Sequence, residues 1–226
     1  GAATRAVSEI MSRGHLPCAI EFMDHQCLEL VRDQLPFATS GEDAMLLLES
    51  DGMPSQVAAD MEAMGRICRE MGARHLLPAA DDRERTRLWE VRRMVSLRIH
   101  DTAGLYIPED VVVPLSRIAD LVAALPELEK QFGLKIYAFG HAGDGNIHLN
   151  ITAAGKNLAE QAEAGVVAVL KLVLAMGGTM SGEHGVGLAK RPYLTLELSP
   201  ASIRLQQGIK KVFDPADILN PGKIFP

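Results

Sequence analysis

Two strand-like runs meet at a glycine-rich turn in residues 135–152, and this hairpin constrains the fold more than any other feature of the chain. The runs are Lys135–His141 and Asn146–Thr152, and Asp144-Gly145 lies between them. Asp-Gly is typical of a two-residue type I′ turn. Such a turn pairs His141 with His148, so we expect their Cβ atoms to lie about 4.5–5.5 Å apart, within reach of one metal ion.

The second run has a polar face and an apolar face. Side chains alternate along a strand, so Asn146, His148 and Asn150 share one face and the apolar residues between them share the other. The apolar face is expected to enter the core. The polar face is predicted to form the floor of a ligand site, because glycines in the turn let a ligand approach the backbone. The alternative is a solvated hairpin whose histidines have no role.

Strand and helix patterns alternate along the rest of the chain. Their order predicts an α+β fold in which ferredoxin-like βαβ units form a mixed or antiparallel sheet covered by helices on one face. The helix that begins at 115 is expected to break at Pro126. The further strands are predicted at 17–22, 44–49 and 110–114, and the helices at 53–71, 81–98, 115–125, 157–176 and 199–213.

Composition excludes several classes of protein. The 226 residues are 47% hydrophobic and 23% charged, which is typical of a folded globular chain. A net charge of −6 without a basic run argues against nucleic acid as a partner. The longest mostly apolar stretch, 164–176, is too short to span a membrane. Three cysteines without a CxxC pair indicate a reducing compartment, so we expect a cytoplasmic protein.

A second concentration of chemistry-bearing residues lies in Ser181–Gly187, where Glu183 and His184 are adjacent and flanked by three glycines. Two histidines and one carboxylate are a common ligand set for zinc, manganese or ferrous iron, with positions left open for substrate. We therefore predict a divalent metal bound by His141, His148 and Glu183. His184 is then free for proton transfer.

Several separated motifs resemble the C-terminal, substrate-binding half of the FAD-linked 2-hydroxy-acid oxidases and dehydrogenases. This family includes the glycolate oxidase flavin subunit, D-lactate dehydrogenase and D-2-hydroxyglutarate dehydrogenase. The motifs occur in the same order in this chain, and most of them lie in its second half. They are Leu88–Arg92 (LWEVR), Phe139–Asn150 (FGHAGDGNIHLN), Ser181–Gly187 (SGEHGVG) and the tail Phe213–Lys223 (FDPADILNPGK).

The resemblance implies that this chain is one half of an enzyme. Residues 1–16 would be a linker helix that follows an absent FAD-binding domain, and residues 17–226 would be the C-terminal domain that holds substrate and metal. The implied cofactors are FAD and a divalent metal. The implied partners are the FAD-binding domain, a small 2-hydroxy-acid substrate and an iron–sulfur or other electron-transfer subunit.

The resemblance also implies roles for individual residues. His141, His148 and Glu183 match metal ligands, and His184 matches a base near the flavin. Arg92 matches a residue that pairs with the substrate carboxylate. The residues expected to bind substrate are Arg92, Ser96 and Asn150, and those expected to contact FAD are Asn146 and Asn220.

The predicted function is oxidation of a small 2-hydroxy acid, of the glycolate or D-lactate type, to the 2-oxo acid. FAD would accept the hydride, the metal would acidify the substrate hydroxyl, and His184 would take its proton. Pro108 stands where the hydroxyglutarate enzymes place a lysine, which favours the glycolate oxidase type. Two alternatives stay open: a metal-dependent hydrolase that uses the same ligands to activate water, and a docking domain without activity.

Overall fold

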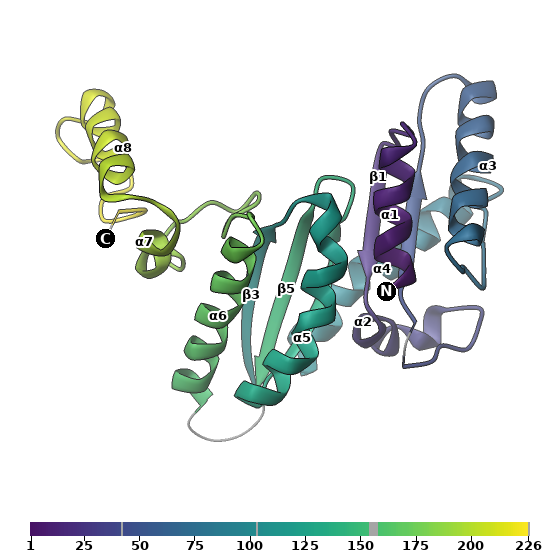
Figure 1. Cartoon of the computed structure of the whole chain (residues 1–226), viewed down its shortest axis with the longest axis horizontal. Helices are drawn as coiled ribbons and strands as arrows, with labels where there is room; N and C mark the ends of the chain where they lie inside the picture. The colour runs from purple at the N-terminus through teal and green to yellow at the C-terminus, as the bar shows by residue number, and fades with distance from the viewer. Residues whose placement is uncertain (42, 103, 154–157, 226) are drawn as a thin grey trace.

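A five-stranded antiparallel sheet with the strand order β2-β1-β4-β5-β3 forms the centre of the protein (Figure 1). The computed structural model describes residues 1–41, 43–102, 104–153 and 158–225. Because β2 and β3 lie at the two edges, the strands that carry the hairpin motif are interior. The strands are β1 Ala19–Met23, β2 Met45–Glu49, β3 Leu105–Val112, β4 Lys135–His141 and β5 Asn146–Ala153.

The predicted helices are present, and the segment expected to be a linker helix contains α1; α2 and α7 were not predicted. The predicted start of the helix at 157 lies outside the described residues. No helix in the described ranges is long and apolar enough to cross a membrane. The helices are α1 Ala2–Ser12, α2 His25–Leu30, α3 Pro54–Glu70, α4 Asp82–Thr102, α5 Ile118–Phe132, α6 Leu158–Ala175, α7 Leu194–Glu197 and α8 Pro200–Phe213, and the 3₁₀ turns are η1 Arg32–Gln34, η2 Leu115–Arg117 and η3 Arg191–Tyr193.

The predicted α+β class is confirmed, and all the strand pairs are antiparallel. The unit β3-α5-β4 is a split βαβ, because β3 and β4 both pair with β5, which lies between them. This arrangement matches the ferredoxin-like units that were expected. It also places the polar face of β5 between two neighbouring strands, each of which can add side chains to it.

Helices pack on both faces of the sheet, so the expectation of a single covered face was wrong. The main core lies between one face and α1, α3, α5 and α6, and it includes the buried Val7 and Ile10 of α1. A second core packs Val95 of α4 and residues of α2 against the opposite face, where Tyr137 and Phe139 are buried. Aromatic side chains on the second face of β4 therefore give α4 a partner, and α4 is the helix that carries Arg92.

The hairpin β4–β5 has a different register from the predicted one. His148 pairs with Phe139, two residues before His141, so a four-residue loop replaces the two-residue turn. The backbone N–H of Ala142 donates to a carbonyl of β1 (2.8 Å), so residue 142 is bonded to β1 and the loop begins two residues earlier than predicted. The two histidines are consequently diagonal neighbours on one face, with ring centroids 5.3 Å apart, rather than directly opposite each other.

The expected break at Pro126 does not occur, because α5 continues through it to Phe132. Pro126 is exposed, so the carbonyl that loses its helical hydrogen bond can be solvated. Leu121 and Leu125 are buried just before the proline and hold this part of the helix on the core. Tertiary packing thus outweighs the local preference of proline.

Strand β3 begins five residues earlier than the prediction of 110–114 and includes Pro108. A proline cannot donate to a strand ladder, but an edge strand tolerates one. β3 pairs only with β5 among the named strands, so it is such an edge. The longer strand brings Asp110 directly opposite His148.

Substitution of Gly145 is expected to destabilise the hairpin loop strongly. Gly145 has a φ of +82°, and a Cβ added there would lie 2.2 Å from the carbonyl oxygen of Val113. Gly177 is a matched control, because its φ is +78° but its Cβ would meet open space. Backbone strain alone costs about 1–2 kcal/mol, and the clash adds about 1–3 kcal/mol. Urea unfolding should therefore show a larger loss for Gly145→Ala than for Gly177→Ala, and equal losses would contradict this account.

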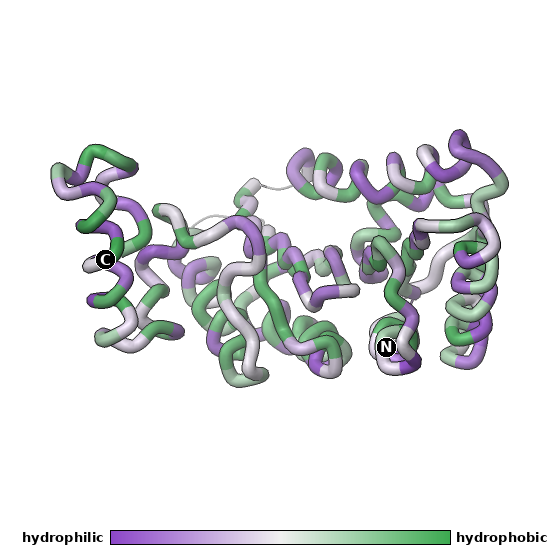
Figure 2. The backbone as a smooth tube through the Cα atoms, turned by 90° about the horizontal axis from the view of Figure 1, so that it is seen from above, coloured by the Kyte–Doolittle hydropathy of each residue, from purple (hydrophilic) through white to green (hydrophobic). Residues whose placement is uncertain are grey.

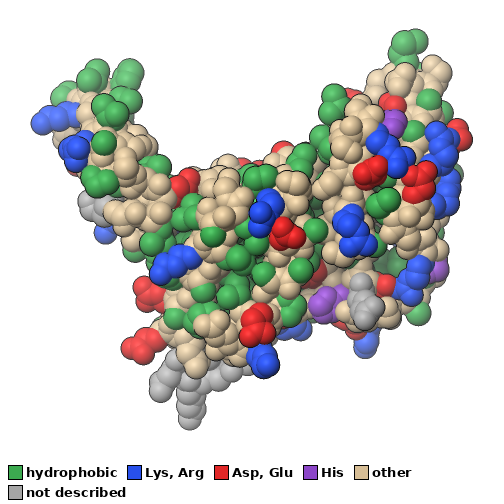
Figure 3. Space-filling model, in the orientation of Figure 1, with side chains coloured by type: hydrophobic (Ala, Val, Ile, Leu, Met, Phe, Trp, Pro, Cys, Tyr) green, Lys and Arg blue, Asp and Glu red, His purple; other side chains and the backbone are tan. Residues whose placement is uncertain are grey.

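The C-terminal segment of α7, α8 and the tail lies to one side of the sheet (Figures 1 and 2). Hydrophobic side chains gather on its surface (Figure 3). Residues at steps of three and four along α8, with two from the tail, are between 59% and 80% exposed, and Ile203 is the buried residue of α8. We call this set the α8 apolar face; it consists of Leu205, Ile209, Val212, Phe213, Ile218 and Leu219.

Candidate metal and substrate site

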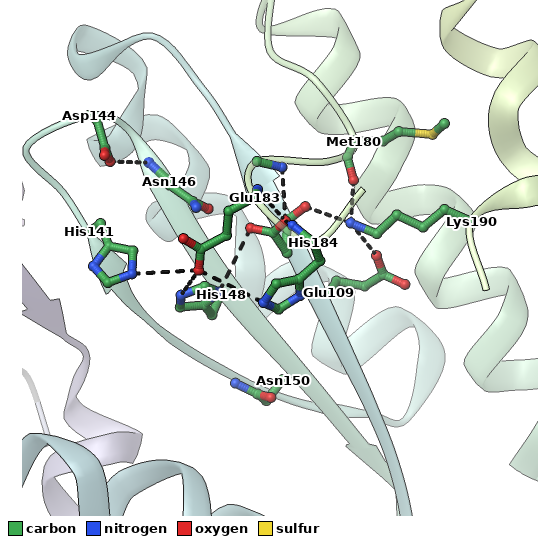
Figure 4. Close-up of polar contacts among 12 residues, drawn as sticks. Glu109, His141, Asp144, Asn146, His148, Asn150, Met180, Glu183, His184 and Lys190 are labelled. Carbon is green, nitrogen blue, oxygen red and sulfur yellow. Dashed lines mark hydrogen bonds and ion pairs between the residues drawn. The ribbon is translucent and has the colours of Figure 1, made fainter. Parts of the chain in front are cut away.

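The three predicted metal ligands come together above the polar face of β4 and β5 (Figure 4). His141 is the last residue of β4, His148 lies in β5, and Glu183 belongs to the loop that follows α6. The Glu183 Oε1 atom lies 3.6 Å from Nε2 of both histidines. One ligand atom from each residue lies within 4.8 Å of the other two. The structure thus places two imidazoles and one carboxylate around one point.

His148 is the most enclosed of the three side chains. Burial lowers the pKa of its imidazole, and the neighbouring His141 lowers it further. Both effects favour the neutral ring. A neutral imidazole with a free Nε2 is the form that can bind a metal ion.

His184 joins the same cluster from the loop. Its ring stacks on that of His148 at a centroid distance of 5.6 Å, and its Nε2 lies 3.8 Å from Glu183 Oε1. Its side chain is 55% exposed, so it borders the open side of the cluster. This position gives His184 access to a molecule that approaches the three predicted ligands from solvent.

Asp110 fixes the loop that carries Glu183 and His184. Its Oδ2 accepts hydrogen bonds from the backbone N–H groups of Gly182, Glu183 and His184 at 2.8–2.9 Å. Its Oδ1 lies 3.8 Å from His148 Nδ1. The Asp110 side chain is fully buried. One carboxylate therefore sets the loop conformation and lies beside Nδ1 of His148, the ring nitrogen that does not face Glu183.

Lys190 bonds the backbone of β3 and of the residue before the same loop. Its buried ammonium donates to the carbonyl oxygens of Asp110 (2.6 Å) and Met180, and it lies 3.5 Å from Glu109 Oε2. Burial raises the pKa of Glu109, although Lys190 partly offsets this effect. The lysine thus connects β3 to the start of the glycine-rich loop.

Arg92 and Glu21 form a buried ion pair beside the cluster. Arg92 Nε donates to Glu21 Oε2 at 2.7 Å, and its guanidinium lies over the ring of Phe139, 4.4 Å from the centroid. The other oxygen of Glu21 contacts His141 Nδ1. The structure therefore places Arg92 next to the predicted ligands, held by Glu21; its role toward a substrate carboxylate stays a prediction.

Of the remaining predicted residues, two share a strand face with His148 and two lie on other elements. Asn146 and Asn150 lie on the same face of β5 as His148 and are buried. Asn150 accepts a hydrogen bond from the Tyr106 hydroxyl (2.6 Å). The other two are Ser96, half-buried one turn after Arg92 on α4, and Asn220, which lies in the exposed tail and accepts from Lys223.

Buried polar atoms without a partner gather at this site. Within the described residues, Asn146 Oδ1, Asn150 Nδ2 and Asp110 Oδ1 are buried and have no hydrogen-bond partner. Ser181 Oγ, at the start of the loop, is also buried without a hydrogen-bond partner in the described part of the chain. Native proteins leave few such groups, and those they leave need an explanation. A polar ligand on this face would supply it.

Sequence reasoning missed three residues that build the site: Glu21, Asp110 and Lys190. The available signal was a charged residue inside an apolar strand pattern, as in Ala19–Met23 (AIEFM) and in Asp110–Val113. Charged side chains are rarely fully buried unless they are paired. Lys190 carried no such signal, because it lies in a segment without a strand or helix pattern.

The sequence matches a family model described as FAD linked oxidases, C-terminal domain, over residues 1–224. The chain belongs to this family. Its membership confirms the resemblance on which the site residues were assigned. The match begins at residue 1, so it includes the segment for which a linker helix was predicted.

Curated relatives of this FAD-linked oxidase domain are oxidases and dehydrogenases. The glycolate oxidase subunit GlcD of Bacillus subtilis is 36% identical over 99% of this chain and 48% of its own length. A D-lactate dehydrogenase of Anaerostipes hadrus is 33% identical over 92% and 46%. The mitochondrial D-2-hydroxyglutarate dehydrogenase of Rattus norvegicus is 30% identical over 94% and 40%. The chain spans about half the length of the relatives it matches.

Solved structures of low sequence identity share the fold of this FAD-linked oxidase domain. A 4-ethylphenol oxidase from Gulosibacter chungangensis superposes with a TM-score of 0.69 at 15% identity, covering 100% of this chain and 51% of its own. A p-cresol methylhydroxylase gives a TM-score of 0.67 at 12% identity, with coverage of 98% and 49%. These likenesses concern the fold alone.

Proposed function

We propose that this chain is the substrate and metal domain of an FAD-dependent enzyme that oxidises a small 2-hydroxy acid to the 2-oxo acid. The observation that carries this proposal is the cluster of His141, His148 and Glu183 with His184 at its open side. The relatives named glycolate oxidase and D-lactate dehydrogenase support a substrate of that class. Pro108, in place of a lysine, supports a substrate with a single carboxylate.

The donor set fits a divalent transition metal such as zinc, manganese or iron. Two ligands bound about 2.1 Å from a tetrahedral metal lie about 3.4 Å from each other. The two contacts of Glu183 with the histidines, 3.6 Å each, are close to that value. When bound, the metal would supply a Lewis acid that lowers the pKa of the substrate hydroxyl. His141, His148 and Glu183 would hold it.

The chain's own residues would bind the substrate and move one proton. Arg92 would bind the substrate carboxylate through the nitrogen atoms that face away from Glu21. Asn150 and Ser96 would contact the rest of the substrate. His184 would take the hydroxyl proton through Nε2 as the bond to hydrogen at the neighbouring carbon breaks. FAD supplies the acceptor of that hydride when bound, so the products are a 2-oxo acid and reduced flavin.

The flavin would come from a separate FAD-binding domain, because the relatives are about twice as long as this chain. Asn146 and Asn220 are the proposed contacts of this chain with FAD. The α8 apolar face supports docking of another domain, since apolar side chains that gather on an exposed surface mark an interaction site. We further propose reoxidation by an iron–sulfur or other electron-transfer subunit. Three free cysteines support a location in the cytoplasm.

Anaerobic flavin bleaching tests the proposal in the protein joined to its FAD-binding domain. Glycolate or D-lactate is expected to reduce the bound flavin, and His148→Ala should slow this reduction at least tenfold while FAD content stays unchanged. The reason is that His148 would bind the metal and not the flavin. Metal content is measured on the same samples. Flavin that stays oxidised with every small 2-hydroxy acid, or ester or amide hydrolysis by this chain alone, would overturn the proposal.

A further inference from the structure

Glu21 connects two elements of the proposed site that are far apart in sequence. It lies on β1, directly opposite His141 on β4, and is almost fully buried. One carboxylate oxygen contacts His141 Nδ1 and the other accepts from Arg92 Nε at 2.7 Å. The role assigned to Glu21 below rests on the proposed function, in which His141 binds metal and Arg92 binds substrate.

We propose that Glu21 is a positioning residue that selects the tautomer of His141 and holds Arg92 at the same time. A carboxylate has two acceptor oxygens and no proton, so it can accept from two donors. Accepting from His141 places the imidazole proton on Nδ1. Nε2 is then left with a lone pair, and Nε2 is the atom that faces Glu183. A carboxylate partner of this kind orients metal-binding histidines in general.

An amide at position 21 could not serve both neighbours. Glutamine has the shape of glutamate but only one acceptor oxygen, and its nitrogen is a donor. The oxygen is expected to face Arg92, because a hydrogen bond to a charged donor is the stronger one. The amide nitrogen then faces His141 Nδ1, which has to become an acceptor. The imidazole proton moves to Nε2, where it competes with metal binding.

Imidazole nitrogen NMR of the metal-free chain tests the tautomer directly. At a pH of about 8 we expect His141 to carry its proton on Nδ1 in the parent chain and on Nε2 in Glu21→Gln. Because this reading needs no metal, flavin or substrate, it is independent of the proposed function. A proton on Nε2 in the parent chain, or an unchanged tautomer in the variant, would overturn the proposal.

Titration of the same chains with Mn²⁺ and Zn²⁺ measures the consequence for binding. Glu21→Gln is expected to bind each metal 10–100-fold more weakly. His141→Ala separates the two proposals. If it binds as tightly as the parent, the proposed metal site fails. If it loses binding while Glu21→Gln does not, the site stands and the role of Glu21 fails.

Two further variants separate positioning from a general loss of structure. Asp24 is also buried, and its two oxygens accept backbone N–H groups of Cys27 and Ala138 at 2.8 Å, away from the cluster. Asp24→Asn creates the same mismatch of donors and should leave metal affinity within about threefold. Adding Arg92→Leu to Glu21→Gln removes the competing donor, so the glutamine oxygen can return to His141. The double variant should regain the Nδ1 proton and most of the affinity, and continued loss would overturn the proposal.

Discussion

Replacing His184 with alanine, in the protein joined to its FAD-binding domain, is expected to slow flavin reduction by about 10²–10⁴-fold without loss of metal. This is the usual contribution of a positioned acid or base. His184 borders the open side of the cluster, whereas the ligand atoms of His141, His148 and Glu183 face one another within 4.8 Å. Stopped-flow single turnover with glycolate or D-lactate measures the step directly.

Arg92→Ala is the comparison for this experiment. A group that holds the substrate carboxylate binds ground state and transition state nearly alike, so its loss should act mainly on KM. A proton acceptor matters as the bond breaks, so the loss of His184 should act mainly on the rate at saturating substrate. If His184→Ala loses its metal and reduces flavin at the parental rate, then Glu183 and His184 have exchanged the roles assigned to them.

Asp110→Ala is expected to lower the free energy of unfolding by about 3–5 kcal/mol, the range for removing one partner from a buried charged interaction. The change removes the acceptor of the Glu183 and His184 N–H groups and leaves the Gly182 N–H only the backbone carbonyl of residue 110, at 3.4 Å. It also leaves Lys190 near the cavity so created. Urea unfolding of the metal-free chain measures the loss, and a change below about 1 kcal/mol would contradict the role of Asp110 in the loop.

The pH dependence of Asp110→Asn provides a check on the charge. Burial by itself raises the pKa of the Asp110 carboxyl, but the N–H groups of His184 and Glu183 and the ammonium of Lys190 lower it more, and the net shift is downward. A depressed folded pKa adds stability above the unfolded pKa of about 3.9 and loses it as the pH falls through the folded value. The free energy of unfolding of the parent should therefore exceed that of Asp110→Asn near neutral pH. The difference between the two should shrink as the pH falls below about 4.

The sequence was sufficient for the fold class and for the three residues of the cluster. Alternation along β5 correctly separated the polar face of His148 from the apolar one, because period-two patterning is a local property. The register of the hairpin was not predictable in the same way. Asp144-Gly145 favours a two-residue turn, but pairing of Ala142 with β1 fixes a longer loop, and that partner lies over a hundred residues away in the chain.

The supporting residues were harder to predict than the ligands. Glu21 and Asp110 interrupt apolar strand patterns, but the sequence does not show which groups they contact. Their partners come from distant segments, since Glu21 meets His141 and Asp110 meets the loop at Glu183. The helix at 81–98 was predicted, but its place on the second face was not, because the aromatic residues of β4 do not indicate which helix covers them.

The contacts that build the site have a consequence for folding kinetics. Glu21 and His141 are separated by 120 residues, and Asp110 and Glu183 by 73. Closing such long loops costs entropy before any native contact is gained, and chains dominated by distant contacts fold slowly. The three ligand atoms can therefore converge only after the sheet has assembled. A metal ion that binds this cluster would stabilise the folded chain by mass action, and it would slow unfolding more than it speeds folding.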